Sequence, residues 1–288
     1  MTTGAVTDAT RLLPVMRRML YASTILVISI SFFLFLFPAR TETLFAWTIN
    51  PPLTAAVLGA SYLASAPMTY LAARETVWAR ARVAVPGVIL FTALTTLATF
   101  IHLDRFHLDA PNLFTRFVTW VWLLVYILDP IFFSYALFRQ TRPPQVDPPR
   151  LAPLATWYRL ALVALGAPML LFGALMFIAP ARAIPLWPWE LTPLTCRAVG
   201  AWSVGIGFVI LHAAWENDGA RLRGAAVALC LLGLLQLFNL VRFAGTLDWG
   251  RTSAIVYTLF MAAATLVGGF GWWRASRDSR YLAAQRSA

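Results

Sequence analysis

Long apolar runs alternate with short polar stretches along the whole chain. A transmembrane helix needs about 20 predominantly apolar residues. Eight segments fit this length, and they are 20–37, 53–73, 83–101, 117–137, 158–178, 194–215, 224–241 and 252–273. The pattern predicts an all-α, polytopic integral membrane protein with eight transmembrane helices. Membrane lipids are its expected surroundings.

Basic residues gather in alternate loops between these segments. Sixteen arginines lie on one side of the predicted membrane and seven on the other, and no lysine is present. Cytoplasmic loops of membrane proteins carry an excess of Arg and Lys. We therefore expect a multi-pass protein of a bacterial-type cytoplasmic (inner) membrane with both termini in the cytoplasm.

Composition narrows the function classes. The chain is 60% hydrophobic and only 12% charged, whereas a soluble domain has about 25% charged residues. The net charge of +11 comes from short arginine clusters between apolar runs, which is not the pattern of a nucleic-acid-binding face. No metal-ligand spacing and no nucleotide-binding motif is present. We expect no cofactor, and the sequence does not indicate an oligomeric state.

Tryptophans lie near the ends of the predicted helices. The amphipathic indole ring suits the headgroup layer of a membrane, so the sequence predicts interface anchors rather than a ligand cage. The aromatic loops 41–52 and 183–193 are expected in the same layer. The tryptophans concerned are Trp47, Trp78, Trp157, Trp187, Trp189, Trp215, Trp249, Trp272 and Trp273.

A proline-rich stretch divides the chain at its midpoint. Prolines recur between Arg139 and Pro153, and proline lacks the N–H of a helix and favours an extended spacer. The predicted units are a first four-helix transmembrane repeat (1–138), a cytoplasmic linker (139–157), and a second repeat with a cytoplasmic tail (158–288).

The two halves share a series of motifs in the same order. Chance matching of apolar sequence would not reproduce loop Pro, Glu and Arg in this way. Four helices is an even number, so the repeats are expected to be parallel and related by an axis along the membrane normal. The recurring motifs are Pro38-Ala39-Arg40 with Pro180-Ala181-Arg182, Pro52-Leu53-Thr54 with Pro193-Leu194-Thr195, Gly59-Ala60 with Gly200-Ala201, Glu75 with Glu216, Arg80-x-Arg82 with Arg221-x-Arg223, and Leu103-x-Arg105-Phe106 with Leu240-x-Arg242-Phe243.

Small residues mark the second helix of each repeat. The Gly-Ala pairs permit close helix contact, and the stretch 200–207 contains two small-xxx-small pairs. The sequence predicts a tight helix crossing there. Pro52 and Pro193 fit the first turn of a helix, where a missing N–H does no harm.

A resemblance rests on these features. A four-helix unit with a proline stop, an aromatic outer loop, a proline-led second helix opening onto Gly-Ala and a short charged inner turn is similar to the DoxX-like small membrane proteins. More loosely, it is similar to sterol-isomerase type membrane proteins. The resemblance covers most of 158–273 and, through the repeat, 20–138. It implies a fold, and it assigns no catalytic residue.

Asp129 is the clearest anomaly in the apolar segments. It lies about two turns from the inner end of the fourth helix, beside Pro130. An ionisable side chain within a membrane is costly and is a functional hypothesis by default. Pro130 frees a backbone carbonyl one turn earlier. Asp129 is therefore a candidate acid or base, and the alternative is a structural carboxyl bonded to Tyr126, Tyr135 or an arginine.

Glu75, Glu216 and His212 are further candidate catalytic residues. The two glutamates recur at the inner ends of the second and sixth helices, each beside several arginines. The alternative is a salt bridge, with Arg74, Arg80 or Arg82 for Glu75 and with Arg221 or Arg223 for Glu216. His212 precedes Glu216 by one helical turn, so the two can meet as a proton site. The alternative for His212 is a packed histidine at the membrane interface.

The outer loop 102–109 carries two histidines and two aspartates. Metal binding is one interpretation, but this alternation is no known ligand frame, and a solvated loop fits better. The sequence thus leaves two functions open. One is the binding of a lipid-like or isoprenoid molecule within the bundle, with acid/base chemistry at Asp129. The other is a non-catalytic transporter or a scaffold subunit of a membrane complex.

Overall fold

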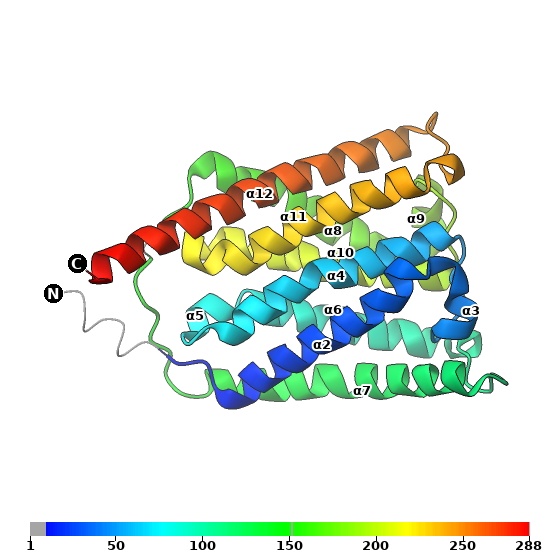
Figure 1. Ribbon diagram of the computed structural model, residues 1–288, viewed down its shortest axis with the longest axis horizontal. Helices are drawn as coiled ribbons and strands as arrows, with labels where there is room; N and C mark the ends of the chain where they lie inside the picture. Colours follow the sequence, from blue (N-terminus) through cyan, green and yellow to red (C-terminus); the bar gives the residue numbers. More distant parts are fainter. Residues whose placement is uncertain (1–9, 151, 288) are drawn as a thin grey trace.

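The computed structural model describes residues 10–150 and 152–287, and the described residues form helices joined by short loops, with no strand among them. Each of the eight predicted segments coincides with a long helix, and the helices lie side by side (Figure 1). Seven of them are long and apolar enough to cross a membrane. These are α2 (Pro14–Leu36), α6 (Ala84–Ile101), α7 (Leu113–Thr141), α8 (Thr156–Ile178), α10 (Pro193–Glu216), α11 (Gly219–Arg242) and α12 (Thr252–Ser287).

The eighth long helix, α4 (Pro52–Arg74), has 23 residues but is less apolar than the others. It is built largely from alanine, serine, threonine and glycine, and its side chains are buried on nearly every side. A helix surrounded by other helices needs small residues more than large apolar ones, because its neighbours must approach its backbone.

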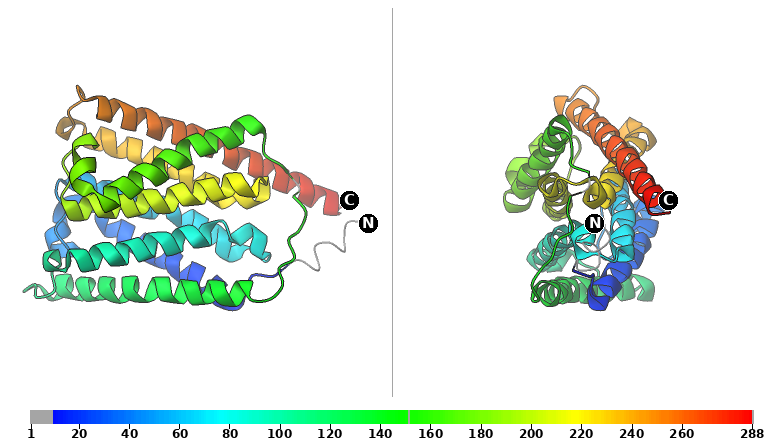
Figure 2. Two further views of the ribbon diagram at one scale, coloured as in Figure 1. Left: turned by 180° about the vertical axis from the view of Figure 1, so that it is seen from behind. Right: turned by 90° about the vertical axis from the view of Figure 1, so that its left-hand side faces the viewer.

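Short helices close the two ends of the bundle. The start of α2, the linker between α7 and α8 and the end of α12 all lie at one end (Figure 2), which we call the arginine-rich end. The short helix α5 (Trp78–Ala81) belongs to this end. The opposite end carries η1 (Pro38–Arg40), α3 (Thr41–Leu44), η2 (Leu103–Arg105), α9 (Pro180–Ala183), η3 (Ile184–Leu186) and η4 (Ala244–Thr246).

Several helices begin before the predicted apolar segments. The side chain of Asn112 accepts hydrogen bonds from the first turn of α7, at 2.9 Å from the nitrogen of Phe114. Asp218 caps α11 in the same way, at 2.9 Å from the nitrogen of Ala220. These caps satisfy N–H groups that have no partner within the helix, so each helix includes polar residues that an apolar window leaves out. Pro52 and Pro193 do lie at the starts of α4 and α10, as predicted.

The helices pack in pairs. In the first half α2 packs on α4 and α6 on α7, and in the second half α8 packs on α10 and α11 on α12. The halves meet where α4 contacts α11 and where α6 contacts α10. The helices α4 and α10 therefore lie in the interior (Figure 1).

Glycines allow the closest of these contacts. A Cβ atom added to Gly59 on α4 would lie 2.5 Å from the backbone nitrogen of Phe35 on α2. A Cβ atom added to Gly200 on α10 would lie 2.8 Å from the carbonyl oxygen of Gly173 on α8. The Gly-Ala pairs thus mark close helix contacts in both halves, as predicted.

The tight crossing predicted within 200–207 is confirmed, and it serves two neighbours. A Cβ atom on Gly207 would lie 2.6 Å from the nitrogen of Leu170 on α8. A Cβ atom on Gly205 would lie 3.1 Å from the carbonyl oxygen of Gly87 on α6. One short stretch of α10 therefore fixes the approach of a helix from each half.

The interpretation of all nine tryptophans as interface anchors is wrong for four of them. Trp47, Trp78, Trp187 and Trp189 are buried, whereas Trp157, Trp215, Trp249, Trp272 and Trp273 are exposed. Part of each aromatic loop folds back over the opposite end and inserts its rings between helices. Trp189, for example, donates from Nε1 to Oγ1 of Thr54 at 3.0 Å. Position near a helix end does not by itself say whether a ring faces inward or outward.

Replacing Gly59 by alanine should destabilise the bundle by about 1–3 kcal/mol, because its methyl group would collide with backbone atoms of α2 that cannot rotate away. Thermal unfolding of the purified protein in detergent measures the effect. Gly245 is the matched control, because nothing lies within 4 Å of an added Cβ atom there. Equal melting temperatures for the Gly59→Ala and Gly245→Ala variants would contradict the close contact.

Candidate functional site

Asp129 lies in the middle of α7, where the helix has an internal proline. Pro130 cannot donate to the carbonyl of Tyr126, and the hydroxyl of Thr96 on α6 donates to that carbonyl instead. As predicted, Pro130 leaves this carbonyl without its partner within the helix, and a residue of a neighbouring helix supplies the hydrogen bond instead. This contact fixes the part of α7 that carries Asp129 against α6.

Asp129 has no hydrogen-bond or ion-pair partner among the described residues. The expected structural partners are engaged elsewhere, because the hydroxyl of Tyr126 shares a hydrogen bond with that of Tyr62, and Tyr135 accepts from Arg139 at 2.8 Å. A carboxyl group in an apolar environment without a partner is costly. No contact therefore supports the alternative that Asp129 is a structural carboxyl bonded to a tyrosine or an arginine.

The side chain of Asp129 lines a cavity, which we call the Asp129 cavity. It lies between α2, α4, α6, α7, α10 and α11 and measures about 50 Å³, taken as the space open to water-sized groups. Hydroxyl groups stand out in an otherwise apolar wall. They come from Ser23, Ser65, Thr69, Thr92, Tyr62 and Tyr126.

Aromatic rings close one side of the Asp129 cavity. Trp202 of α10 packs against Phe91 with ring centroids 4.0 Å apart and meets Tyr62 edge-on at 4.7 Å. Trp202 belongs to the second half of the chain, so the wall of the cavity is shared between the halves. Sequence inspection missed this residue because a tryptophan within an apolar run gives no signal of a site.

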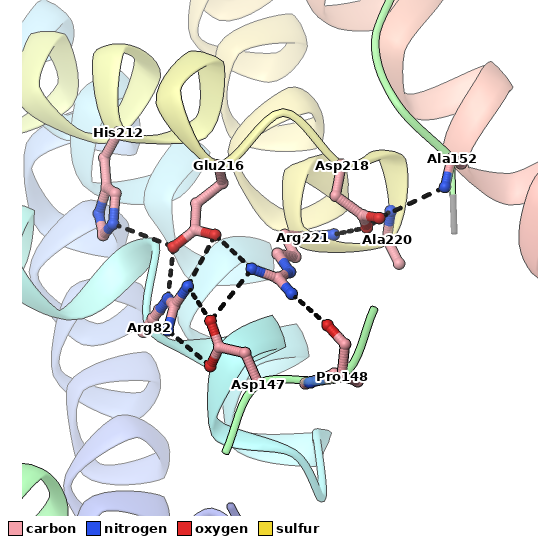
Figure 3. A network of polar contacts seen from close by, with 9 residues as sticks. All are labelled: Arg82, Asp147, Pro148, Ala152, His212, Glu216, Asp218, Ala220 and Arg221. Atoms are coloured by element: carbon pink, nitrogen blue, oxygen red, sulfur yellow. Dashed lines mark hydrogen bonds and ion pairs between the residues drawn. The ribbon is translucent and has the colours of Figure 1, made fainter. Parts of the chain in front are cut away.

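Glu216 and His212 lie in a different place, at the arginine-rich end of α10 (Figure 3). Their side chains meet as predicted, with His212 Nε2 at 3.4 Å from Glu216 Oε1. Glu216 is completely buried and also binds two arginines, Arg221 at 2.6 Å and Arg82 at 2.9 Å. The buried carboxylate therefore has more charged partners than the His–Glu pair alone would give it.

Arg82 connects the two halves. Sequence inspection offered it as a partner of Glu75 in its own half, but in the structure it binds Glu216 of the other half. Its guanidinium also forms a bidentate pair with Asp147 of the linker, at 2.9 and 2.7 Å (Figure 3). No sequence pattern singles out Asp147, because the contact depends on how the linker crosses the bundle.

The linker is held against the bundle by further contacts. Described residues from 143 to 155 form no helix, as the prolines predicted. Arg221 donates to the carbonyl of Pro148 at 2.8 Å, and the nitrogen of Ala152 donates to Asp218 at 3.3 Å. The linker therefore packs against the arginine-rich end of the bundle and is not a spacer without contacts.

Glu75 follows the last turn of α4 and is less enclosed than Glu216. Arg80 lies 3.9 Å from its carboxylate, a long contact for an ion pair. Burial raises the pKa of Glu75, and the charges of Arg80 and Arg223 oppose that rise. Like Glu216, Glu75 thus has one arginine of its own half and one of the other half nearby.

The four candidate residues do not form one site. Glu75, Glu216 and His212 do not line the Asp129 cavity. Two of them belong to a charged cluster at the arginine-rich end, and Glu75 lines a smaller cavity beside Arg80 and Arg223. Only Asp129 combines a missing partner with a cavity wall.

The histidines of the loop 102–109 turn to separate partners. His102 Nε2 lies 2.7 Å from Arg197 Nη1, and His107 contacts Thr48 and the carbonyl of Phe45, each at 3.0 Å. Within the described part of the chain, no group of three or more His, Cys, Asp or Glu side chains is placed to hold a metal ion.

Comparisons with protein-family models, with curated proteins and with solved structures gave no match for this chain.

Replacing Arg82 by methionine should lower the stability by about 3 kcal/mol, because a buried carboxylate loses a charged partner. Chemical or thermal unfolding in detergent measures the loss. The exposed pair Arg105–Asp104 provides the control, since both side chains are about 70% exposed and such pairs contribute about 1 kcal/mol or less. An Arg82→Met variant as stable as Arg105→Met would show that the cluster does not hold the halves together.

Replacing His102 by asparagine should remove part of the loss of stability at low pH. Burial, and then the charge of Arg197, lower the pKa of His102, whereas in the unfolded chain it is about 6.5. The unfolded state therefore takes up the proton first, and the contribution of His102 is lost as the pH falls through about 6.5. Melting temperatures between about pH 8 and pH 5 test this. A slope unchanged from the parent protein would contradict it.

Proposed function

We propose that the protein binds a lipid-like or isoprenoid molecule within its bundle, with the polar end of that molecule at Asp129. The observation that carries the proposal is a carboxyl group without a partner in the wall of an intramembrane cavity. Ionisable residues at such positions in membrane proteins commonly serve a function. The protein is in this view a membrane-spanning binding protein, and Asp129 is the group that exchanges a proton with the ligand if chemistry occurs.

The walls of the cavity favour a ligand that enters from the lipid. Leu26 and Ile30 of α2 and Val125 and Asp129 of α7 line the cavity and are also partly exposed on the outside of the bundle. The helices α2 and α7 pack less closely than α2 and α4 do. A hydrophobic molecule could thus reach the cavity between α2 and α7 without crossing water.

The size of the Asp129 cavity limits what it holds. About 50 Å³ of space for water-sized groups accommodates a polar end and a few carbon atoms. The rest of the ligand's hydrocarbon chain would then lie between α2 and α7 and in the lipid. A hydroxyl or carbonyl end suits the site, because the neighbouring tyrosine, serine and threonine hydroxyls both donate and accept hydrogen bonds.

The architecture that supports this function is an eight-span bundle of two parallel repeats, with units at 1–138 and 158–288 joined by the linker. In this proposal α4 spans the membrane although it contacts little lipid. The matched helix pairs and the matched glycines Gly59 and Gly200 support a duplication. The DoxX-like resemblance, the cytoplasmic placement of the arginine-rich end and a bacterial-type inner membrane belong to the same proposal.

Replacing Asp129 by asparagine should reduce ligand binding at least about tenfold, which corresponds to about 1.4 kcal/mol, without loss of folded protein. The ligand is measured as lipid or terpenoid that co-purifies with the protein, by mass spectrometry. Asp109→Asn, in the exposed outer loop, controls for the loss of a carboxylate. If the Asp129→Asn variant retains its ligand, the proposed role of the Asp129 carboxyl group in binding is contradicted.

A second pair of variants tests the cavity itself. Ser23 lines the cavity, whereas Ser29 on the same helix faces outward. Ser23→Leu fills the space and should abolish co-purification, and Ser29→Leu should not. A protein rather than a lipid as the co-purifying partner, unaffected by either variant, would favour the scaffold function.

A further inference from the structure

A second hollow lies in the other half of the chain, between α8 and α12. It measures about 280 Å³ by the same measure as the Asp129 cavity, so it is the roomier of the two. We call it the α8–α12 groove. Its walls are almost wholly apolar, and they include Pro168, Phe172, Leu186, Trp187, Val256 and Phe260.

On α8 the groove is lined at the positions that the Asp129 cavity uses on α2. When Pro38 is matched with Pro180, the cavity residues Leu26, Val27 and Ile30 coincide with the groove residues Pro168, Met169 and Phe172. The groove has no carboxylate in its wall. The two halves thus offer related hollows of different chemistry.

A small central cavity adjoins the groove on its inner side. Residues Met169, Trp187 and Tyr257 line both hollows. The central cavity measures about 30 Å³ and is lined by both halves, including Ser61 of α4 and Gln236 of α11. A chain lying in the groove would therefore bring one end to the middle of the bundle.

One polar atom of the central cavity wall has no partner among the described residues. The acceptor Oε1 of Gln236 is buried without a hydrogen bond. Gln236 is only 2% exposed, and it lines the central cavity. Leaving such atoms unpaired costs free energy that a ligand can recover.

The orientation of the Gln236 amide is fixed by its surroundings. Its Nε2 donates to the carbonyl of Val57 at 3.0 Å and to the hydroxyl of Ser61 at 3.2 Å. A carbonyl oxygen only accepts, so exchanging the amide atoms would place two acceptors together. The free atom of Gln236 is therefore an acceptor.

We propose that the groove and the central cavity form a second binding site, for a long-chain alcohol. The hydroxyl lies in the central cavity, where it donates to Gln236 Oε1. The hydrocarbon chain lies in the α8–α12 groove and leaves it toward the lipid. A hydroxyl group fits because it is a small, uncharged donor. The site uses no residue of α7, so it does not depend on Asp129.

A photoreactive farnesol that carries a diazirine on its chain tests the site. Irradiation of the full-length protein in detergent, followed by peptide mass spectrometry, shows which helices are labelled. We expect label on α8 and α12, in addition to the label on α2 and α7 that the proposed function predicts. Val256→Trp should reduce that label at least about tenfold, because the indole fills the groove. Ile255→Trp is the matched control, because Ile255 is similarly exposed but does not line the groove. Equal labelling of α8 and α12 in the two variants overturns the proposal, as does the absence of label there in the parent protein.

Competition with unlabelled molecules tests the hydroxyl. Farnesol should compete for the α8–α12 label about three- to tenfold better than farnesane, the hydrocarbon without the hydroxyl, since one hydrogen bond contributes a factor of this size. Gln236→Leu should remove most of this preference while farnesane competes as before, and the melting temperature of the variant in detergent checks that it folds. Equal competition by farnesol and farnesane in the parent protein overturns the assignment of the alcohol.

The same label separates this site from the Asp129 cavity. Ser23→Leu should remove label from α2 and α7 and leave α8 and α12 labelled, whereas Val256→Trp should do the opposite. If Ser23→Leu leaves the label on α2 and α7 unchanged while Val256→Trp acts as expected, the proposed function is contradicted. If Val256→Trp leaves the label on α8 and α12 unchanged while Ser23→Leu acts as expected, the second site is contradicted.

Discussion

Close backbone packing of α4 and α10 is the constraint on which the rest of the bundle depends. Lipid tails are as apolar as leucine, so apolar burial gives helices little reason to associate within a membrane. Packing of small residues and hydrogen bonds between helices must supply that reason. Glycines on α4 and α10 let α2, α8 and α6 approach to backbone contact. The composition of α4, poor in large apolar residues, is a consequence of this position.

Charged side chains join the two halves at the arginine-rich end, in addition to the packing along the length of the helices. Arg82 of the first half satisfies the buried Glu216 of the second, and Asp147 of the linker joins the same cluster. Separating the halves would leave a buried carboxylate with fewer cations around it, which is costly. The proline-rich linker is therefore part of the interface between the halves. Its prolines keep it extended, and its one aspartate ties it to the bundle.

Hollows remain where the packing is less close. In each half the first and last long helices, α2 with α7 and α8 with α12, contact each other less than the main packed pairs do, which are α2–α4, α6–α7, α8–α10 and α11–α12. The Asp129 cavity and the α8–α12 groove lie at these places. The small residues that hold the centre together thus leave the outer helix pairs free to accommodate a ligand. Asp129 and several hydroxyl groups line the first hollow, whereas no carboxylate lines the second.

Periodicity and motif matching foresaw the helices well and the contacts between them poorly. Each apolar segment became a long helix, the prolines at 52 and 193 began their helices, and the stretch 200–207 made a close crossing. These features are local, because the length of an apolar run, a fixed φ angle or a missing side chain acts on the residues that carry it. The tryptophans of the outer loops were misread for the complementary reason. The same ring suits a headgroup layer or a gap between helices.

For the candidate site, the sequence by itself determined that Asp129 is an ionisable residue in an apolar helix, with a proline that frees the carbonyl of Tyr126. Only the tertiary structure decided that Thr96 takes that carbonyl, that Tyr126 is occupied by Tyr62, and that Asp129 is left facing a cavity. It also decided that Arg82 serves Glu216 rather than Glu75. The physical reason is the same in each case. A polar group binds whichever complementary group the packing of distant helices brings within about 3 Å, and sequence separation does not set that distance.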